Sequence, residues 1–414
     1  MTTSDLNSPN WLRSLTPRES STLIATFLGW MLDGMDVMIF SFVMPSLIVL
    51  WHISREQAGL LGTSVLLISA VGGWLAGMAA DRFGRVRVLQ VTIVWFAFFT
   101  FLSGFTSSFW QLMLTRGLQG LGFGGEWAVG SVLIGETIRA QHRGKAVGTV
   151  QSGWALGWGV AAIFYTVLFS FLPAEIAWRI MFWIGLLPAL LVFYIRGRVR
   201  EPEIYVAKKA EQDIAKFHEI FAPGLLRTTL LASLVALGAQ GGYYAITTFL
   251  PLYLQTSRHL SVIGTGGYLA VIISGAFAGY LTSAGLTDSM GRRRTLILFA
   301  VGSFVVVFLY TALPISNSVM LMLGFPLGFF SSGSFSPMGS FFTELFPTRV
   351  RASGQGFAYN FGRGLGAIFP AMVGVLSSRI PLQHAISIFS AGAYLLMVLG
   401  VLALPETRGK ALRE

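Results

Sequence analysis

The feature that most constrains this chain is a succession of long apolar runs. Twelve stretches of about 20 or more mainly apolar residues follow one another along its 414 residues, and about 20 such residues span the hydrocarbon core of a bilayer. In lipid, only α-helices and closed β-barrels satisfy their own backbone hydrogen bonds, and these runs are too long for barrel strands. The sequence therefore predicts an all-α membrane protein with twelve transmembrane helices.

The predicted helices are separated by short polar segments. They cover residues 22–48, 57–80, 86–106, 109–137, 144–172, 178–196, 227–255, 262–285, 294–313, 318–345, 352–377 and 384–405. Only 11% of the residues are charged, against about 25% in soluble proteins. Much of the surface must therefore face lipid, and the bilayer is the first expected partner.

The basic residues predict the orientation in the membrane. Of the 29 Lys and Arg residues, 23 fall in segments that share a side with the N-terminus, and four fall in segments on the other side. Positively charged loops remain cytoplasmic, so we expect cytoplasmic termini in a bacterial-type inner (plasma) membrane. This bias accounts for the net charge of +11, and nucleic acid is not an expected partner.

A long polar stretch near the middle divides the chain into two six-helix halves. The predicted division is an N-terminal tail (1–21), a first six-helix bundle (22–196), a cytoplasmic linker (197–226), a second six-helix bundle (227–405) and a C-terminal tail (406–414). The halves repeat weakly, since the run from Asp81 to Arg85 is echoed by the run from Asp288 to Arg292. Duplicated six-helix halves are a transporter architecture, with the substrate held between them near the midplane.

Three motifs resemble signatures of the major facilitator superfamily. They are Gly77-x-x-x-Asp81-Arg82-x-Gly84-Arg85 after the second span, Arg116-x-x-x-Gly120-x-Gly122-x-Gly124 in the fourth, and Pro405-Glu406-Thr407-Arg408-Gly409 at the end. The resemblance covers the whole chain. It implies the twelve-helix fold of that superfamily, and the second motif is associated with its proton-coupled members.

Three further segments resemble the proton symporters of carboxylates within that superfamily, namely the sialate, lactate-type and aromatic-acid symporters. They are Asp33-Gly34-Met35-Asp36 in the first span, Gly124-Gly125-Glu126-Trp127 in the fourth and Tyr359-Asn360-x-Gly362 in the eleventh. The likeness implies uptake of a small organic anion, such as a monocarboxylate or aromatic acid, together with protons.

Ionisable residues inside the spans are the strongest functional candidates, because each charge at bilayer depth costs about 3 kcal/mol or more unless it is paired or hydrated. Asp33 and Asp36 stand three apart near one helix face, and we expect that both do not ionise readily. By resemblance, Asp36 carries the proton and Arg116 is its partner. The alternative is a fixed ion pair that joins the first and fourth spans.

Two more charged residues complete this set. Glu126 lies about 15 Å along the helix from Arg116, so the two are not expected partners. Glu126 is either a second proton site, a substrate ligand or a buried acid satisfied by a neighbouring span. Arg363 offers a forked match to a carboxylate, with Asn360 beside it, unless it pairs with an internal acid or with helix carbonyls.

Polar and aromatic residues of two other spans are further substrate-binding candidates. They are Gln240, Tyr243 and Tyr244 in the seventh span, and Gln151 and Trp154 in the fifth. By the repeat, Gln240 and Tyr243 occupy the positions of Asp33 and Asp36. Hydrogen bonding or stacking on a substrate is one interpretation, and packing among the helices is the other.

Charged residues at the cytoplasmic ends of the helices are predicted to form conformational latches. They are Asp81, Arg82, Arg85, Glu136 and Arg143 in the first half, and Asp288, Arg292, Glu344 and Arg351 in the second. Each surface pair is worth at most about 1 kcal/mol, so such contacts can form and break during transport.

Several functions are excluded or less favoured. The chain has no cysteine, no phosphate-binding loop of the Gly-x-x-x-x-Gly-Lys-Ser/Thr form and no histidine cluster with metal-ligand spacing. We expect no enzyme activity, no cofactor and no metal, and a monomer. Proton-coupled uptake is the leading prediction, a proton-driven efflux antiporter for metabolites or drugs is the second, and a sensor is the third.

Overall fold

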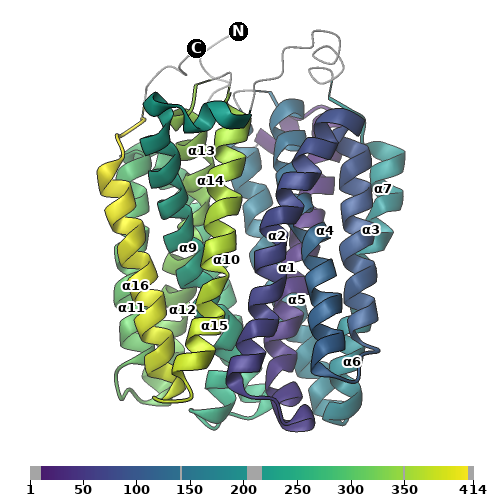
Figure 1. Cartoon of the computed structure of the whole chain (residues 1–414), viewed down its shortest axis with the longest axis vertical. Helices are drawn as coiled ribbons and strands as arrows, with labels where there is room; N and C mark the ends of the chain where they lie inside the picture. Colours follow the sequence, from purple (N-terminus) through teal and green to yellow (C-terminus); the bar gives the residue numbers. More distant parts are fainter. Residues whose placement is uncertain (1–10, 140–141, 203–216, 348–349, 409–414) are drawn as a thin grey trace.

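The structure, a computed structural model, describes residues 11–139, 142–202, 217–347 and 350–408. The side chains of Asp81, Arg143, Asp288 and Arg351 lie outside the described part. The described ranges are helical and contain no strand. Figure 1 shows two groups of long, roughly parallel helices side by side, one formed by α1 to α7 and the other by α9 to α16.

The first half contains six membrane crossings. They are α1 (Pro17–Trp51), α2 (Arg55–Phe83), α3 (Arg85–Ser103), α4 (Phe109–Thr137), α5 (Arg143–Phe171), and the series α6 (Ala174–Ile184), η4 (Leu187–Leu190) and α7 (Leu191–Arg198). The short helix η2 (Trp11–Ser14) precedes α1.

The second half repeats the pattern. Its crossings are α9 (Pro223–Thr256), α10 (Val262–Met290), α11 (Arg292–Thr311), the pair α12 (Asn317–Gly333) and α13 (Phe335–Leu345), the pair α14 (Arg351–Gly366) and α15 (Ile368–Leu376), and α16 (Leu382–Ala403). The short helix η5 (Phe217–Phe221) precedes α9.

Ten of these crossings are long and apolar enough to span a membrane by length and composition alone. The other two are α4 and the α14–α15 pair. The helix α4 carries Arg116 and Glu126, and the α14–α15 pair carries Arg363 and breaks at Ala367. With these two, the fold has twelve membrane helices in two six-helix halves, which confirms the predicted fold class.

Local sequence explains where several helices begin and turn. The side chain of Thr16 caps the start of α1, and Glu19 returns a bond to the Thr16 backbone, which is a capping box. The reversals between α2 and α3 and between α10 and α11 use Gly84 (φ 109°) and Gly291 (φ 97°). Only glycine adopts such positive φ values without strain. Both halves therefore use a glycine at the equivalent turn.

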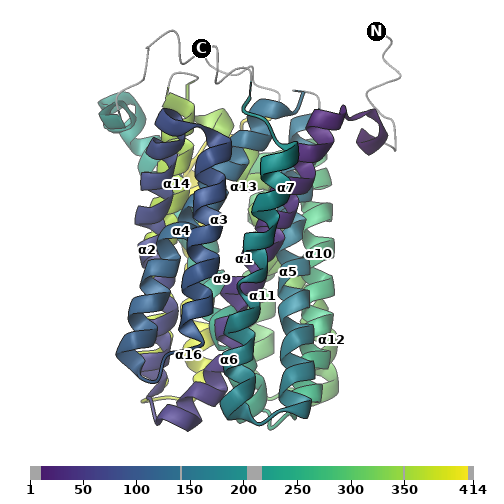
Figure 2. The same ribbon diagram turned by 90° about the vertical axis from the view of Figure 1, so that its right-hand side faces the viewer.

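Charged groups gather at one end of the bundle, called here the charged end. The glutamate that follows each half accepts backbone N–H groups at a helix start. Glu201 accepts from Arg85 and Val86, both at 2.9 Å, and Glu406 accepts from Arg292 at 3.1 Å and from Arg293 at 3.2 Å. The short helix η2 and the ends of α7 and α16 lie at this same end (Figure 2).

The halves meet through α2 against α14–α15 and through α5 against α10. Toward the end opposite the charged end, the Thr63 hydroxyl donates to the Ala367 carbonyl at 2.6 Å and accepts from the Ala371 N–H at 3.2 Å. A Cβ at Gly59 would lie 2.6 Å from the Pro370 carbonyl. The two halves are therefore in direct backbone contact on this side of the midplane.

Candidate functional site between the two halves

A small cavity lies between the halves and is lined mainly by aromatic residues. Its walls are Trp30, Gln151 and Trp154 from the first half and Tyr243, Tyr244, Tyr280, Phe335 and Tyr359 from the second. Its volume is about 10 Å³, which is room for about one water molecule. In this conformation, the helices therefore leave room for little more than a water molecule here.

The aromatic wall is continuous from one half to the other. The ring centroid of Trp30 lies 4.3 Å from that of Trp127 and 4.9 Å from that of Trp154. Across the interface, the Trp154 Nε1–H donates to the Tyr243 hydroxyl at 2.8 Å, and the ring of Trp127 lies 6.2 Å from that of Tyr359. Flat faces and edges therefore bound the cavity on several sides, which suits a planar ligand.

Arg363 is buried beside this cavity, and no acid of the described part of the chain lies within ion-pair distance of it. Its Nε–H donates to the Gln240 side-chain oxygen at 3.2 Å, and Gln240 in turn donates to the Tyr359 carbonyl at 2.9 Å. The guanidinium carbon lies 5.0 Å from the Phe123 ring centroid and 5.1 Å from that of Tyr359. One terminal amino group, Nη1, has no hydrogen-bond partner among the described residues. A buried cation held by an amide and two rings keeps free capacity for an anion.

Asn360, one turn before Arg363, also has a free polar atom. Its Nδ2 donates to the Gly356 carbonyl at 3.0 Å, whereas Oδ1 is buried without a partner among the described residues. A Cβ at Gly73 of α2 would lie 2.7 Å from this Oδ1. Asn360 therefore lies at the interface between the halves, where only a glycine opposite leaves room for it.

Asp36 and Arg116 are connected through a third residue that the sequence analysis missed. The side-chain amide of Gln119 donates to Asp36, and its oxygen accepts from Arg116 Nη1 at 3.3 Å. No ion pair within 4.0 Å joins Asp36 to Arg116, whose guanidinium carbon lies 4.3 Å from the Phe40 ring centroid. The spacing of Gln119, three residues after Arg116 on one helix face, is the signal that could have identified it.

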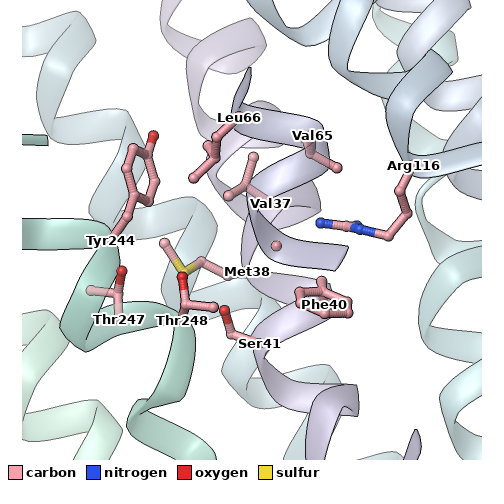
Figure 3. Close-up of a pocket in the computed structure, with 11 residues that line it drawn as sticks. Val37, Met38, Phe40, Ser41, Val65, Leu66, Arg116, Tyr244, Thr247 and Thr248 are labelled. Carbon is pink, nitrogen blue, oxygen red and sulfur yellow. The ribbon is translucent and has the colours of Figure 1, made fainter. Parts of the chain in front are cut away.

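Arg116 also borders a second small cavity, shown in Figure 3. The guanidinium points into it from one side, while Tyr244, Thr247 and Thr248 of α9 line the other side and Ser41 of α1 lies between. Its volume is also about 10 Å³. A space large enough for about one water, with both apolar and polar walls, therefore adjoins the group that is linked to Asp36 through Gln119.

Asp33 and Glu126 form a second acidic group. Both are buried, and no N–H or O–H donor among the described residues reaches either carboxylate oxygen of Asp33. The Asp33 carboxylate lies beside that of Glu126, and Asp36 and Arg363 are its other charged neighbours. The Glu126 carboxylate packs on Gly29, one helical turn before Asp33. The structure thus brings together two acids from α1 and α4 within the field of Arg363.

At the charged end, ion pairs join residues that were predicted as latches. In the first half, Glu136 pairs with Arg85 at 3.3 Å. In the second half Glu344 likewise pairs with Arg292 at 2.9 Å. In both pairs, the acid near the end of one crossing meets the arginine at the start of a neighbouring helix, Arg85 of α3 or Arg292 of α11.

These two pairs connect helices of the same half. Among the residues predicted as latches, Arg82 lies 5.3 Å from the Phe83 ring centroid, and Asp81, Arg143, Asp288 and Arg351 lie outside the described side chains. Burial acts to raise the pKa of Glu406, but the backbone N–H groups around it, including that of Arg292, outweigh burial and lower the pKa. Glu406 is thus held as a carboxylate that fixes the start of α11.

A bundle of two repeated six-helix halves, with a small aromatic cavity and buried charged residues between them, is the architecture of a membrane transporter. The chain matches the description "Major Facilitator Superfamily" over residues 26–371, and it belongs to that superfamily. The members are transporters, and this chain is a transporter and not an enzyme.

Individual relatives agree with this assignment. The chain is 42% identical over 98% of its length to a probable 4-methylmuconolactone transporter of Cupriavidus pinatubonensis, covering 94% of that protein. It is 30% identical over 92% of its length to the cis,cis-muconate transport protein of Acinetobacter baylyi, covering 93% of that protein. The inward-open structure of the xylose transporter XylE from E. coli is similar in fold, with a TM-score of 0.73, 21% identity, and coverage of 95% and 98% of the two chains.

Proposed function

We propose that this protein takes up a small, planar organic acid together with protons by alternating access of the cavity to the two sides of the membrane. The single observation that carries the proposal is the buried Arg363 guanidinium, which has an unpartnered Nη1 and no acid within ion-pair distance among the described residues. An unpaired buried charge is costly, and a substrate carboxylate would satisfy it.

The relatives support an unsaturated acid as the cargo. Muconate is a conjugated dicarboxylate, and 4-methylmuconolactone is a lactone derived from such an acid. Both are flat over part of their length. The aromatic walls of the cavity, including Trp30, Trp154 and Tyr359, favour ligands of this kind over bulky saturated ones.

Buried acids support proton coupling. Asp36 contacts Gln119, and Asp33 lies beside Glu126, all within the bilayer depth, where an acid without a function is disfavoured. We propose that Asp36 carries the coupled proton, with Asp33 and Glu126 as a second proton site. Protons that bind with the anion also reduce the net charge that crosses the membrane.

The second candidate is proton-driven efflux by antiport. It uses the same fold, and an acid-lined cavity suits cationic drugs. The buried cation at Arg363 favours anions instead, because a cationic ligand would be repelled there.

We propose uptake in an inner membrane by a monomer, with the charged end and both termini in the cytoplasm, in line with the distribution of basic residues.

The test is transport by purified protein in proteoliposomes. With an acidic exterior and a neutral interior, we expect concentrative uptake of labelled cis,cis-muconate, abolished by a protonophore. Accumulation that is faster with an acid-loaded interior would contradict symport and favour antiport.

The same assay tests Arg363. The substitution Arg363→Lys keeps the charge but loses the forked geometry, so we expect at least about a tenfold loss in kcat/KM for uptake. The exposed Arg379 provides the control, since Arg379→Lys should retain normal uptake. Normal transport by the Arg363→Lys variant would show that Arg363 does not bind the anion.

A further inference from the structure

The indole N–H of Trp30 is a buried donor that the protein leaves unused. Trp30 lies on α1, is 4% exposed and lines the cavity between the halves. Its Nε1 has no hydrogen-bond partner among the described residues. A buried donor without an acceptor is unfavourable, so its presence in a cavity wall calls for a ligand that accepts.

The neighbouring tryptophan, Trp154, differs from Trp30 because the protein supplies an acceptor for its indole N–H. Trp154 packs 4.9 Å from Trp30, ring to ring, and its Nε1–H donates to the Tyr243 hydroxyl at 2.8 Å. The two neighbouring indoles therefore differ in their hydrogen bonding. The Trp154 N–H is bonded across the interface, whereas the Trp30 N–H has no acceptor among the described residues.

Two unused donors from different halves thus lie in the cavity wall or beside it. Arg363 Nη1 is the second, on α14, next to Tyr359, which lines the cavity. Their chemistry differs, because a guanidinium matches a carboxylate whereas a single neutral N–H matches one neutral acceptor. Gln151 and Tyr244, also in the wall, can donate or accept, so they do not select for an acceptor as an indole does.

We propose that Trp30 is a specificity-determining residue whose Nε1–H donates to a second acceptor on the substrate, remote from the carboxylate held by Arg363. The ligand class is a planar acid that carries a carbonyl oxygen, such as that of a lactone, or a ring nitrogen. This inference rests on the proposed function, since it takes Arg363 as the carboxylate site. Recognition at both points would connect α1 to α14 and so favour closure of the halves around a ligand that has both groups.

The test uses substrates that differ by one acceptor. Benzoate and nicotinate have nearly the same shape and charge, and only nicotinate has a ring nitrogen. In proteoliposomes with an inward proton gradient, we expect wild-type protein to prefer nicotinate in competition with labelled cis,cis-muconate. The Trp30→Phe variant keeps a ring but loses the donor, so the preference for nicotinate over benzoate should fall by roughly three- to tenfold.

Trp154→Phe is the matched control. It removes an indole donor that is already bonded to Tyr243, so it should affect benzoate and nicotinate alike. An unchanged nicotinate-to-benzoate ratio in the Trp30→Phe variant would overturn the inference.

A second measurement needs no variant and covers the case in which Trp30→Phe does not fold. Competition by benzoate, picolinate, nicotinate and isonicotinate moves the nitrogen around the ring, and we expect one position to bind at least about threefold better than benzoate. Equal competition by all four would overturn the role of Trp30 while leaving carboxylate transport intact. If wild-type protein transports no carboxylate at all, the proposed function fails, and this inference fails with it.

Discussion

At the scale of single residues, Arg363, Arg116 and Asp36 are hydrogen-bonded by neutral side chains, and no ion pair among the described residues includes them. Gln240 holds Arg363, and Gln119 stands between Arg116 and Asp36. An amide can donate or accept after a rotation of its side chain, whereas a direct ion pair would lock the charges together. The charges therefore remain available to a substrate or a proton.

A prediction at this scale concerns Gln119. The substitution Gln119→Leu removes both bonds and leaves Asp36 and Arg116 without their link. Bonds to charged groups are worth about 1.5–3 kcal/mol, so we expect at least a tenfold loss of proton-driven accumulation, measured as the steady-state ratio of internal to external substrate.

The control is Gln111→Leu on the same helix. Gln111 bonds to the exposed Ser107 at the start of α4 and should tolerate the change. Full accumulation by the Gln119→Leu variant would mean that the amide does not link Asp36 to Arg116.

At the scale of elements, two features mark the break between α14 and α15. Pro370 lacks the N–H that would bond to the Gly366 carbonyl, and a side chain of α2 enters the next position of the backbone ladder. The Thr63 hydroxyl of α2 occupies the place of the helical bond between Ala371 N–H and Ala367 C=O, bonding to both groups. Insertion of a side chain into the backbone ladder is a known cause of helix bending. When the halves separate here, the two backbone groups become free to bond to each other.

This arrangement predicts that Thr63 stabilises the closed state at the end opposite the charged end. Thr63→Val keeps the shape but removes the hydroxyl, and one hydrogen bond is worth about 1 kcal/mol, so opening should rise about fivefold. The chain has no cysteine, and a Ser41→Cys background reports opening as its rate of labelling by a membrane-impermeant maleimide.

Thr63→Ser is the matched variant, because it retains the hydroxyl and should label at the parent rate. Equal labelling of the Val and Ser variants would show that the hydroxyl does not control this gate.

At the scale of the whole molecule, the repeated halves would allow the proposed alternating access to the two sides of the membrane. Each half has its own charged-end framework, in which Glu201 or Glu406 fixes a helix start and an Arg–Glu pair joins two helices of the same half. The halves can therefore move as units, while the contacts between them change. In the proposed mechanism, the acids Asp33, Asp36 and Glu126 take up the coupled protons.

Coupling between proton and substrate gives the prediction at this scale. Asp36→Asn cannot exchange a proton, so we expect the variant to exchange external for internal substrate but to lose concentrative uptake by at least about tenfold. Counterflow in proteoliposomes measures the first property and gradient-driven uptake the second. The exposed Glu175 provides the control substitution Glu175→Gln, and continued accumulation by Asp36→Asn would assign the proton to another group.

Much of the architecture could be predicted from sequence because it depends on local length and polarity. The span predicted at 109–137 coincides with α4, despite the charges of Arg116 and Glu126. The helix α1 begins at Pro17, five residues before its predicted start at 22, because the Thr16 cap extends it beyond the apolar run. A membrane-spanning helix can be predicted by comparing the length of an apolar run with the bilayer thickness. This comparison does not require the positions of the other helices.

The sequence by itself determined the twelve helices, their division into two halves and which ionisable groups enter the membrane. Only the tertiary structure decided which groups meet. It paired Glu136 with Arg85, inserted Gln119 beside Asp36, gave Arg363 an amide in place of an acid, and left the Trp30 donor open. The physical reason is that contacts between different helices depend on how segments distant in the chain pack together. The spacing of residues along one helix carries no information about that packing.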